Sequence, residues 1–188
     1  MSVPRTNGKL IVISGPSGVG KTTICRALRG RGRIVRSVSA TTRVPRPGEV
    51  DGKDYFFLTR EAFEAKQAAG GFLEWAEYAG FLYGTPRDFV EKELAAGNCP
   101  LLEIEVQGVE QLRGLKFPGL YIFLAPPSVE DLRKRLEGRG AMAPEVIERR
   151  IAVARKELER KDLYDHVVVN DTVDRALAEV LKILDAAL

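Results

Sequence analysis

Cysteine and histidine are scarce in this chain of 188 residues, which contains two cysteines and one histidine. Cys25 and Cys99 do not have the spacing of metal ligands, and His166 has no cysteine or second histidine near it. These absences exclude a metal centre built on cysteine and histidine. We expect both cysteines to be reduced and to lie in or near the core.

Long apolar runs are also absent. No segment approaches the roughly 18 apolar residues that a membrane-spanning helix needs, and residues 1–8 contain no apolar run. The chain contains no low-complexity tract and no internal repeat. We therefore expect a soluble cytoplasmic protein with no membrane partner.

A large excess of one charge is missing too, because 29 Lys and Arg residues are balanced by 26 Asp and Glu residues. A long nucleic-acid footprint normally requires a stronger basic excess than this net charge of +3. We expect a mixed, solvated surface and no nucleic-acid partner. The 45% hydrophobic fraction is typical of a globular protein, and the length suits one domain.

Short apolar runs alternate with helical patterns along most of the chain. The runs read as buried strands at residues 10–14, 34–38, 100–105, 120–124 and 167–169, and helices are predicted to begin at Thr22, Gln107, Ser128, Pro144 and Val173. Strands that alternate with helices are typical of an α/β fold with a parallel sheet.

Two segments interrupt this alternation. The first contains a Pro/Gly-rich loop at 44–48, short aromatic strands near 55–58 and a helix from Thr59, and it predicts an inserted subdomain. The second places glycines on both sides of Arg139, which suits a hinged lid. We expect a single domain whose core spans about 8–40, 98–132 and 151–188, with the subdomain at about 41–97 and the lid at about 133–150.

The strongest motif follows the first predicted strand and opens the first predicted helix. It satisfies the pattern G-x-x-x-x-G-K-[ST] of a phosphate-binding loop, in which glycines turn backbone N–H groups toward phosphate oxygens. Lys21 would reach the β and γ phosphates, and the hydroxyl of Thr22 would bind Mg²⁺. We expect ATP and Mg²⁺ as cofactors, with ATP bound by Gly15, Pro16, Ser17, Gly18, Val19, Gly20, Lys21, Thr22 and Thr23.

A second anion site is indicated in the inserted segment. Arg43 and Arg46 lie three residues apart in a proline-containing loop, and Tyr55 follows. Two guanidinium groups match phosphate oxygens, and a tyrosine hydroxyl completes such a site without adding charge. On these residues alone, a merely solvated arginine-rich loop remains the alternative.

Glu74 stands out among the apolar residues Phe72, Leu73 and Trp75. If this segment is a strand, alternation directs Glu74 to one face and Leu73 and Trp75 to the other. The carboxylate would then be available to a ligand, although an exposed strand glutamate explains the same pattern.

Taken together, these segments resemble guanylate kinases from Lys9 almost to the C-terminus. The strings S-V-S-A-T-T-R-V-P-R-P-G-E and F-L-E-W-A-E-Y, followed by Y-G-T, carry the resemblance together with the phosphate loop. It implies a P-loop kinase fold with a parallel core sheet flanked by helices, a mixed α/β GMP-binding subdomain and a small helical lid. The implied reaction is ATP-dependent phosphorylation of GMP, and also of dGMP, in purine nucleotide metabolism.

The resemblance also assigns residues by position. It implies that Arg43, Arg46, Tyr55 and Tyr83 hold the GMP phosphate, that Ser39, Glu74 and Thr85 surround guanine, and that Arg135, Arg139 and Arg150 close over the phosphates. Lys21, Arg43 and the three closing arginines would then stabilise the charge of the transition state. No general base is required, because the acceptor phosphate is already largely a dianion near pH 7.

The chain departs from the family at Glu105, where related proteins generally have aspartate. Glu105 is expected to contact guanine, and Glu103 is expected to support Mg²⁺ directly or through water, but the added methylene leaves both assignments open. The strand end at Asn170 resembles the family segment near adenine, and a turn that caps the last helix explains it equally well.

Two other functions fit parts of the pattern. A noncatalytic guanylate-kinase-like module that binds phosphopeptides would normally have a damaged phosphate loop, whereas Gly20, Lys21 and Thr22 are all present. A related P-loop kinase for another phosphorylated acceptor is opposed by Glu74 and by the Tyr83-Gly-Thr segment. We expect small-molecule substrates, GMP and ATP.

Overall fold

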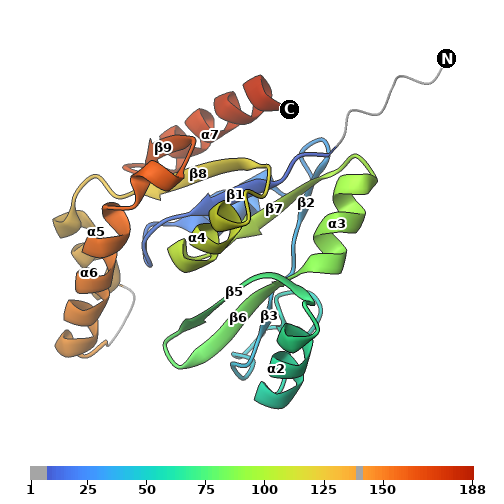
Figure 1. Ribbon diagram of the computed structural model, residues 1–188. Coiled ribbons are helices and arrows are strands. Elements are labelled where there is room, and N and C mark those ends of the chain that lie inside the picture. Colours follow the sequence, from blue (N-terminus) through green and yellow to red (C-terminus); the bar gives the residue numbers. More distant parts are fainter. Residues whose placement is uncertain (1–7, 139–141) are drawn as a thin grey trace. The chain divides into compact units, whose positions relative to one another are not determined.

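The structure, a computed structural model, describes residues 8–138 and 142–188 (Figure 1). It is a mixed α/β protein whose core strands run parallel and are flanked by helices. The chain divides into two compact units, the first formed by Met1–Leu10, Gly30–Leu102 and Gln107–Pro118, and the second by Ile11–Arg29, Glu103–Val106 and Gly119–Leu188.

The second unit is built on three parallel strands, in which β8 pairs with β1 on one side and β9 on the other. Their bounds are Ile11–Ser14 for β1, Leu120–Ala125 for β8 and His166–Val169 for β9. Every residue of β1 and β8 is buried, which explains why these strands read as unbroken apolar runs rather than as alternating patterns. The phosphate-loop sequence joins β1 to the following helix, α1 (Lys21–Leu28).

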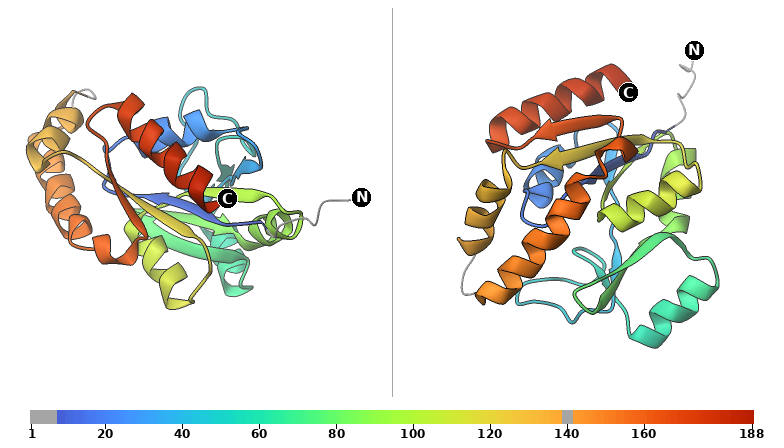
Figure 2. Two further views of the ribbon diagram at one scale, coloured as in Figure 1. Left: turned by 90° about the horizontal axis from the view of Figure 1, so that it is seen from above. Right: turned by 60° about the vertical axis from the view of Figure 1, so that its left-hand side comes forward.

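Helix α7 (Val173–Ala187) lies along β9 and beside α1 (Figures 1 and 2). It buries Ala176, Val180 and Leu184, which recur every four residues and therefore form one apolar stripe. The first helix residue after the strand, Val173, is the position at which the sequence predicts this helix to begin.

Helices α5 (Val129–Glu137) and α6 (Pro144–Leu158) lie side by side in the second unit (Figure 1). The hydroxyl of Ser128 caps α5 by accepting a hydrogen bond from the backbone N–H of Asp131, at 2.9 Å. Arg133 forms an ion pair with Glu148 across the two helices. Their apolar contact consists of Leu132, Leu136, Ile147, Ile151 and Ala154. A short 3₁₀ helix, Lys161–Leu163, leads from α6 to β9.

The first unit contains a four-stranded mixed sheet in the order β4-β3-β6-β5. Strands β5 (Phe72–Tyr78) and β6 (Phe81–Pro86) form an antiparallel hairpin, whose two turn residues both have positive φ angles, 52° at Ala79 and 83° at Gly80. Positive angles at both turn positions match the twist of paired strands. The two remaining strands are short, at Ala40–Thr41 for β3 and Phe56–Phe57 for β4.

Helix α2 (Arg60–Ala68) covers one face of this sheet. Phe63, on this helix, is fully buried, and its ring stacks on that of Phe72 with centroids 4.3 Å apart. Ala40 and Leu82 complete the cluster. These contacts hold the hairpin and the helix together as one small core.

The other elements of the first unit are two helices and two parallel strands. Helix α3 (Arg87–Ala95) follows β6 directly, and α4 (Val106–Gly114) is joined to β5 by hydrogen bonds in both directions between Gln111 and the backbone of Trp75. Strand β2 (Ile34–Arg36) pairs in parallel with β7 (Cys99–Glu103). The last residue of β7 belongs to the second unit, so this strand crosses the boundary between the units.

The helix starts expected from the sequence are confirmed to within one residue at Thr22, Thr59, Gln107, Ser128, Pro144 and Val173. The extent of the β5–β6 hairpin and the whole of α3 were not predicted. The buried cysteines are confirmed, since Cys25 is 2% exposed and Cys99 is 0% exposed, and both are free thiols.

A substitution at Gly84 tests the packing between α2 and the sheet. A Cβ atom added there would lie 2.9 Å from the ring of Phe72 and 3.0 Å from that of Phe63. We expect Gly84→Ala to lower the free energy of unfolding by about 1–3 kcal/mol, because both rings are already in contact and cannot both withdraw. Urea denaturation measures the change.

The matched control is Gly114→Ala, at the end of α4, where an added Cβ meets nothing within 4 Å. This change should alter the free energy of unfolding by less than about 1 kcal/mol. Equal effects of the two substitutions would show that the ring contacts do not limit the space at Gly84.

Candidate functional site

The phosphate loop in the second unit has the backbone conformation that its glycines allow. Gly20 has φ 102° immediately before α1, a value that favours glycine. A Cβ atom at Gly20 would also lie 2.5 Å from Nδ2 of Asn170, so the position has neither the conformation nor the space for a side chain. The helix N-terminus that follows offers unpaired N–H groups to an anion.

Lys21 lies in this loop with only 8% of its surface exposed. Its Nζ donates a hydrogen bond to the carbonyl oxygen of Gly15 at 2.5 Å and forms an ion pair with Glu105 at 3.1 Å. Burial lowers the pKa of Lys21, but Glu105, assisted by Glu157 and Glu103, outweighs that effect and raises the pKa above its ordinary value. The ammonium is therefore held charged.

Thr22 and Glu103 meet beside the same lysine. The hydroxyl of Thr22 donates a hydrogen bond to Oε1 of Glu103 at 2.5 Å. A hydroxyl and a carboxylate together offer the oxygen ligands that Mg²⁺ prefers. Among residues 8–138 and 142–188, no group of three or more His, Cys, Asp or Glu side chains could hold a metal ion by itself.

Glu157, on α6, adds a carboxylate that the sequence did not indicate. Burial and the nearby Glu105 carboxylate raise the pKa of Glu157 to about 7, while Lys21 acts in the opposite direction. Of these two carboxylates, Glu105 is the one that makes the direct ion pair with Lys21.

Asn170 and Arg135 lie against the phosphate loop from β9 and α5. The side-chain amide of Asn170, which is 2% exposed, donates to the carbonyl oxygen of Val19 at 2.7 Å. Arg135 donates to the carbonyl oxygens of Asn170 and Asp171, at 2.7 and 3.2 Å. A cavity of about 490 Å³ opens at this place, lined by Gly18, Val19, Gly20, Arg135, Gly138, Asn170, Asp171 and Val173. Its size is within the range of small-ligand sites.

We call the residues of the phosphate loop with Glu103, Glu105, Arg135 and Asn170 the donor cluster. The residues expected around GMP, other than Glu105, form the acceptor cluster, which belongs to the first unit: Ser39, Arg43, Arg46, Tyr55, Glu74, Tyr83 and Thr85. Glu105, expected beside guanine, thus belongs to the second unit, where it pairs with Lys21.

Arg43, in the acceptor cluster, is buried, with only 8% of its surface exposed. Its guanidinium group is held in place by hydrogen bonds. It donates to the carbonyl oxygen of Val44 at 2.7 Å and to Glu49 at 2.9 Å. Burial lowers the pKa of Arg43, but Glu49 and Tyr83 outweigh it and raise the value. Glu49 also accepts a hydrogen bond from the backbone N–H of Arg46 at 2.8 Å. One carboxylate therefore holds the guanidinium group of Arg43 and the backbone of Arg46.

Aromatic side chains surround the same guanidinium group. The ring of Tyr55 lies 5.5 Å from the Arg43 guanidinium carbon, and that of Phe57 lies 5.9 Å from it. Tyr55 and Tyr83 meet edge to face, with centroids 6.1 Å apart. The structure therefore brings together Arg43, Tyr55 and Tyr83, three of the four residues expected to hold a phosphate.

Glu74 and Thr85 form a buried polar pair between β5 and β6. Glu74 is 5% exposed and Thr85 is 0% exposed, and the threonine hydroxyl donates to Oε1 of Glu74 at 2.5 Å. An exposed strand glutamate is therefore excluded for Glu74. A carboxylate is expensive to bury without donors, so this one is suited to a ligand that supplies N–H groups.

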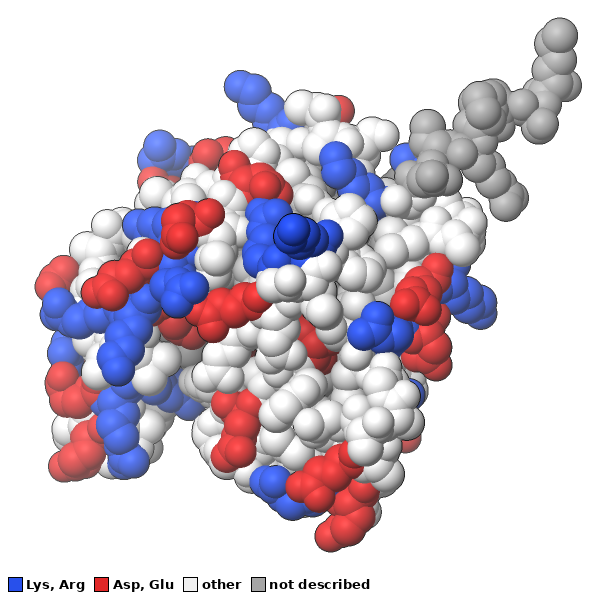
Figure 3. Space-filling model, viewed as in Figure 1, with Lys and Arg blue, Asp and Glu red and all other residues white. Residues whose placement is uncertain are grey.

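The arginines expected in the lid are only partly described. Arg139 lies outside the described residues, and Arg150 is half-buried on α6. Basic and acidic side chains are interspersed over α5 and α6, as the ion pair of Arg133 with Glu148 illustrates (Figure 3). Within the described part of the chain, no helix is long and apolar enough to span a membrane.

Comparisons with known proteins identify the family of this chain. The family model for guanylate kinase matches residues 7–187. Guanylate kinase of Shouchella clausii strain KSM-K16 is 49% identical over 183 residues, covering 97% of this chain and 89% of that protein, and guanylate kinase of Synechococcus sp. strain CC9902 is 53% identical over 176 residues, covering 93% and 94%. The crystal structure of guanylate kinase from Anaplasma phagocytophilum superposes with a TM-score of 0.77 at 34% identity, covering 96% of this chain and 86% of that one.

The chain belongs to the guanylate kinase family. Three features of this guanylate kinase-family chain were missed from the sequence: Glu157, the ordering role of Glu49, and the contact of Asn170 with the phosphate loop. The resemblance of the Asn170 segment to the family was a signal for the last, whereas Glu157 had none.

Glu157 predicts how stability depends on pH. An unfolded glutamate has a pKa of 4.5, against about 7 in the folded chain, so between these values the folded state keeps a proton that the unfolded state has released. The free energy of unfolding should therefore fall as pH rises from 5 to 8. In Glu157→Gln this fall should be smaller by about 1–3 kcal/mol, as measured by urea denaturation at both pH values.

Glu159→Gln, at an exposed glutamate one residue beyond α6, is the matched control and should keep the slope of the unsubstituted chain. An unchanged slope in Glu157→Gln would show that Glu157 titrates as an ordinary exposed carboxyl group.

Proposed function

We propose that this chain transfers the γ-phosphoryl group of ATP to GMP, which gives ADP and GDP. The observation that carries the proposal is the buried pair of Glu74 and Thr85 in the acceptor cluster of a chain whose phosphate loop is complete. We further propose that the reaction serves purine nucleotide metabolism in the cytoplasm.

The donor cluster would bind ATP through charge and through backbone N–H groups. Lys21 remains charged because Glu105 offsets the cost of its burial, and it can exchange that carboxylate for phosphate oxygens. The cavity beside Asn170 and Arg135 offers space for the base and ribose next to the phosphate loop. Arg135 is already fixed there by backbone carbonyl groups.

Thr22 and Glu103 fit Mg²⁺. Mg²⁺ typically uses one or two protein oxygens, with water and phosphate oxygens filling its other positions, so two protein ligands suffice. The 2.5 Å contact between the two side chains shows that their oxygens already converge. When bound, the ion would neutralise charge on the phosphates of ATP.

The acceptor cluster would recognise both ends of GMP. Arg43 and Arg46 would hold the phosphate, assisted by the hydroxyls of Tyr55 and Tyr83. Guanine presents N1–H and an N2 amino group side by side, and one carboxylate accepts from both. Glu74 fits this role because it is buried, and Thr85 keeps the carboxylate oriented. Adenine has an acceptor at N1 and would offer that carboxylate a lone pair where guanine offers a donor.

Rate enhancement would come from alignment, exclusion of water and charge stabilisation. Phosphoryl transfer spreads negative charge over the equatorial oxygens, which Lys21, Arg43, Arg135, Arg139 and Arg150 would stabilise. The acceptor dianion attacks without a general base, since the second pKa of a phosphate monoester is about 6. This mechanism therefore does not require the single histidine of the chain.

Glu74→Gln tests the acceptor assignment. The unsubstituted chain should release ADP rapidly with GMP and far more slowly with AMP, UMP or CMP. An amide places an N–H group toward a guanine donor, so the variant should lose at least about 100-fold in kcat/KM for GMP. A coupled ADP-release assay with all four monophosphates measures both effects.

The control is Glu77→Gln, three residues along the same strand but exposed, and it should retain the kcat/KM of the unsubstituted chain. Unchanged kcat/KM for GMP in Glu74→Gln would remove Glu74 from the guanine site. Equal use of the four monophosphates, or ATP hydrolysis without an acceptor, would overturn the proposed specificity.

Glu105→Gln tests the exchange at Lys21. ATP has to displace the Glu105 carboxylate from the ammonium, so removal of its charge should lower the Kd for ATP by about 2- to 10-fold, a gain typical of a partly buried ion pair. Calorimetry in the absence of GMP measures the Kd directly. Because Glu105 is also proposed to contact guanine, the KM for GMP should rise in the same variant.

Glu179→Gln, at an exposed position of α7, controls for the change in net charge and should leave the Kd for ATP unchanged. Weaker ATP binding in Glu105→Gln would mean that Glu105 supports the nucleotide complex instead of competing with it.

A further inference from the structure

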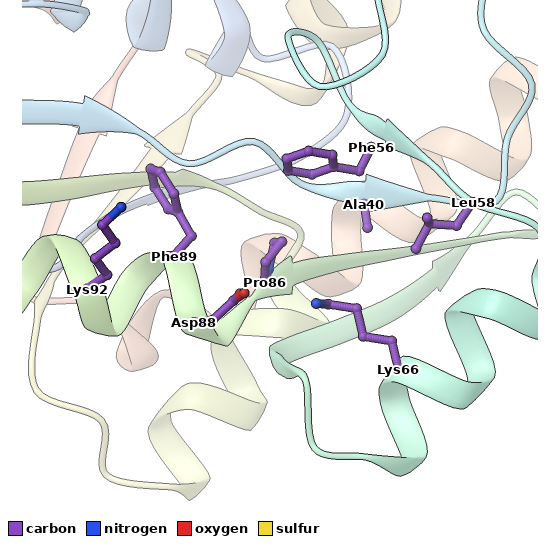
Figure 4. Close-up of a pocket in the computed structure, with 8 residues that line it drawn as sticks. All are labelled: Ala40, Phe56, Leu58, Lys66, Pro86, Asp88, Phe89 and Lys92. Carbon is purple, nitrogen blue, oxygen red and sulfur yellow. The ribbon is translucent and has the colours of Figure 1, made fainter.

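A second cavity, of about 490 Å³, lies entirely within the first unit and contains none of the residues assigned above to ATP or GMP (Figure 4). Its lining comes from strands β3, β4 and β6, the chain just after β4, and helices α2 and α3. The volume is within the range of small-ligand sites. We call it the α2–α3 pocket.

Most of the lining is apolar. The apolar lining residues are Ala40, Phe56, Leu58, Pro86 and Phe89. Phe56 is 40% exposed, and Leu58 and Phe89 are half-buried, so these side chains keep apolar surface in contact with water. A ligand that covers such surface gains the hydrophobic contribution of removing it from water. The phenyl side chains come from different elements, β4 and α3, which favours a flat aromatic ligand that contacts both.

The charged lining is mainly basic. Lys66 comes from α2 and Lys92 from α3, and neither ammonium forms an ion pair with another of the described residues. In Figure 4 the side chain of Lys66 points from α2 in the direction of Pro86 and Asp88. The ammonium of Lys66 lies over the ring of Phe72, 5.8 Å from its centroid, and this contact leaves its positive charge without a carboxylate partner. An anionic group on a ligand would therefore meet positive charge that no carboxylate neutralises directly.

Asp88 is the one carboxylate in the lining, and it has a structural role of its own. It lies in the first turn of α3, where a negative charge stabilises the helix dipole. With two lysines and one aspartate, the charged lining has a net charge of about +1.

The pocket is separate from the acceptor cluster although both use the same strands. Ala40, Phe56 and Pro86 each directly follow a residue of the acceptor cluster. Because successive residues of a strand project to opposite faces, these positions belong to the face of the sheet that α2 covers. A ligand in the pocket would contact the back of the strands proposed to hold GMP.

We propose that the α2–α3 pocket binds a small aromatic anion, with its ring against Phe56 and Phe89 and its acidic group toward Lys66 and Lys92. The class is a planar aromatic molecule with one carboxylate, sulfonate or phosphate group. This binding does not depend on the proposed kinase activity.

The test uses two probes that differ in charge. 8-Anilinonaphthalene-1-sulfonate is an aromatic anion with a flat naphthalene ring that fluoresces when it leaves water, and N-phenyl-1-naphthylamine is its neutral counterpart. Both are titrated with the full chain, with and without saturating GMP and ADP, which block the nucleotide sites without turnover. We expect one sulfonate probe per chain to bind in the presence of both nucleotides.

Substitutions then locate the probe. Lys66→Gln combined with Lys92→Gln should weaken the sulfonate probe by about fivefold or more and change the neutral probe by less than about twofold. Phe56→Ala should weaken both probes, because the ring contact does not depend on charge. Lys182→Gln, at an exposed lysine of α7 in the second unit, should affect neither.

Several outcomes would overturn the proposal. They are displacement of the sulfonate probe by GMP and ADP, binding that is unchanged in the double lysine variant, and binding that is unchanged in Phe56→Ala. Thermal denaturation of each variant shows whether it is folded. If Phe56→Ala is unfolded, protein-detected NMR titration of the unsubstituted chain decides the location, because shifts confined to α2, α3 and β4 support the pocket and shifts elsewhere contradict it.

Discussion

The positive charge of Lys21 has to be kept in a place that is largely closed to water, and much of the second unit is arranged around it. An isolated ammonium in such a place would release its proton, whereas the Glu105 ion pair and the Gly15 carbonyl group keep it charged. Strand β1 ends just before the loop that surrounds the lysine, and α1 begins at the lysine itself. Lys21 can be both buried and charged because Gly15 and Glu105, which come from separate parts of the chain, both contact its ammonium group.

The same requirement governs the first unit, which holds a buried charge of each sign. Glu74 is a buried carboxylate, and Thr85 provides a hydroxyl donor from the neighbouring strand. Arg43 is a buried guanidinium group, and Glu49 provides its counter-charge. Each unit therefore holds buried charged groups that folding alone would disfavour and that neighbouring polar groups orient. Such groups are typical of sites that exchange a protein partner for a ligand.

Much of the fold could be predicted from local signals. Thr59 and Ser128 cap their helices as N-cap residues do, Pro144 occupies a first helical position, and the buried parallel strands read as unbroken apolar runs. The β5–β6 hairpin gave a weaker signal, because its turn places Ala79, and not glycine or asparagine, at a positive φ angle. In the site, motif residues could be assigned by position. Glu157 could not, since nothing near it on α6 indicates that folding brings it close to Lys21 and Glu105.

The alternation of strand residues lets one small sheet carry two different surfaces. Ser39, Tyr55 and Thr85 belong to the acceptor cluster, and the residue after each of them lines the α2–α3 pocket on the other face. The two faces nevertheless share a backbone, and a one-residue shift in register would exchange them. The packing of Phe63 on Phe72 favours a single register, because only that register buries both rings under α2. The apolar core of the first unit therefore does more than stabilise it, since it determines which side chains are presented to a nucleotide.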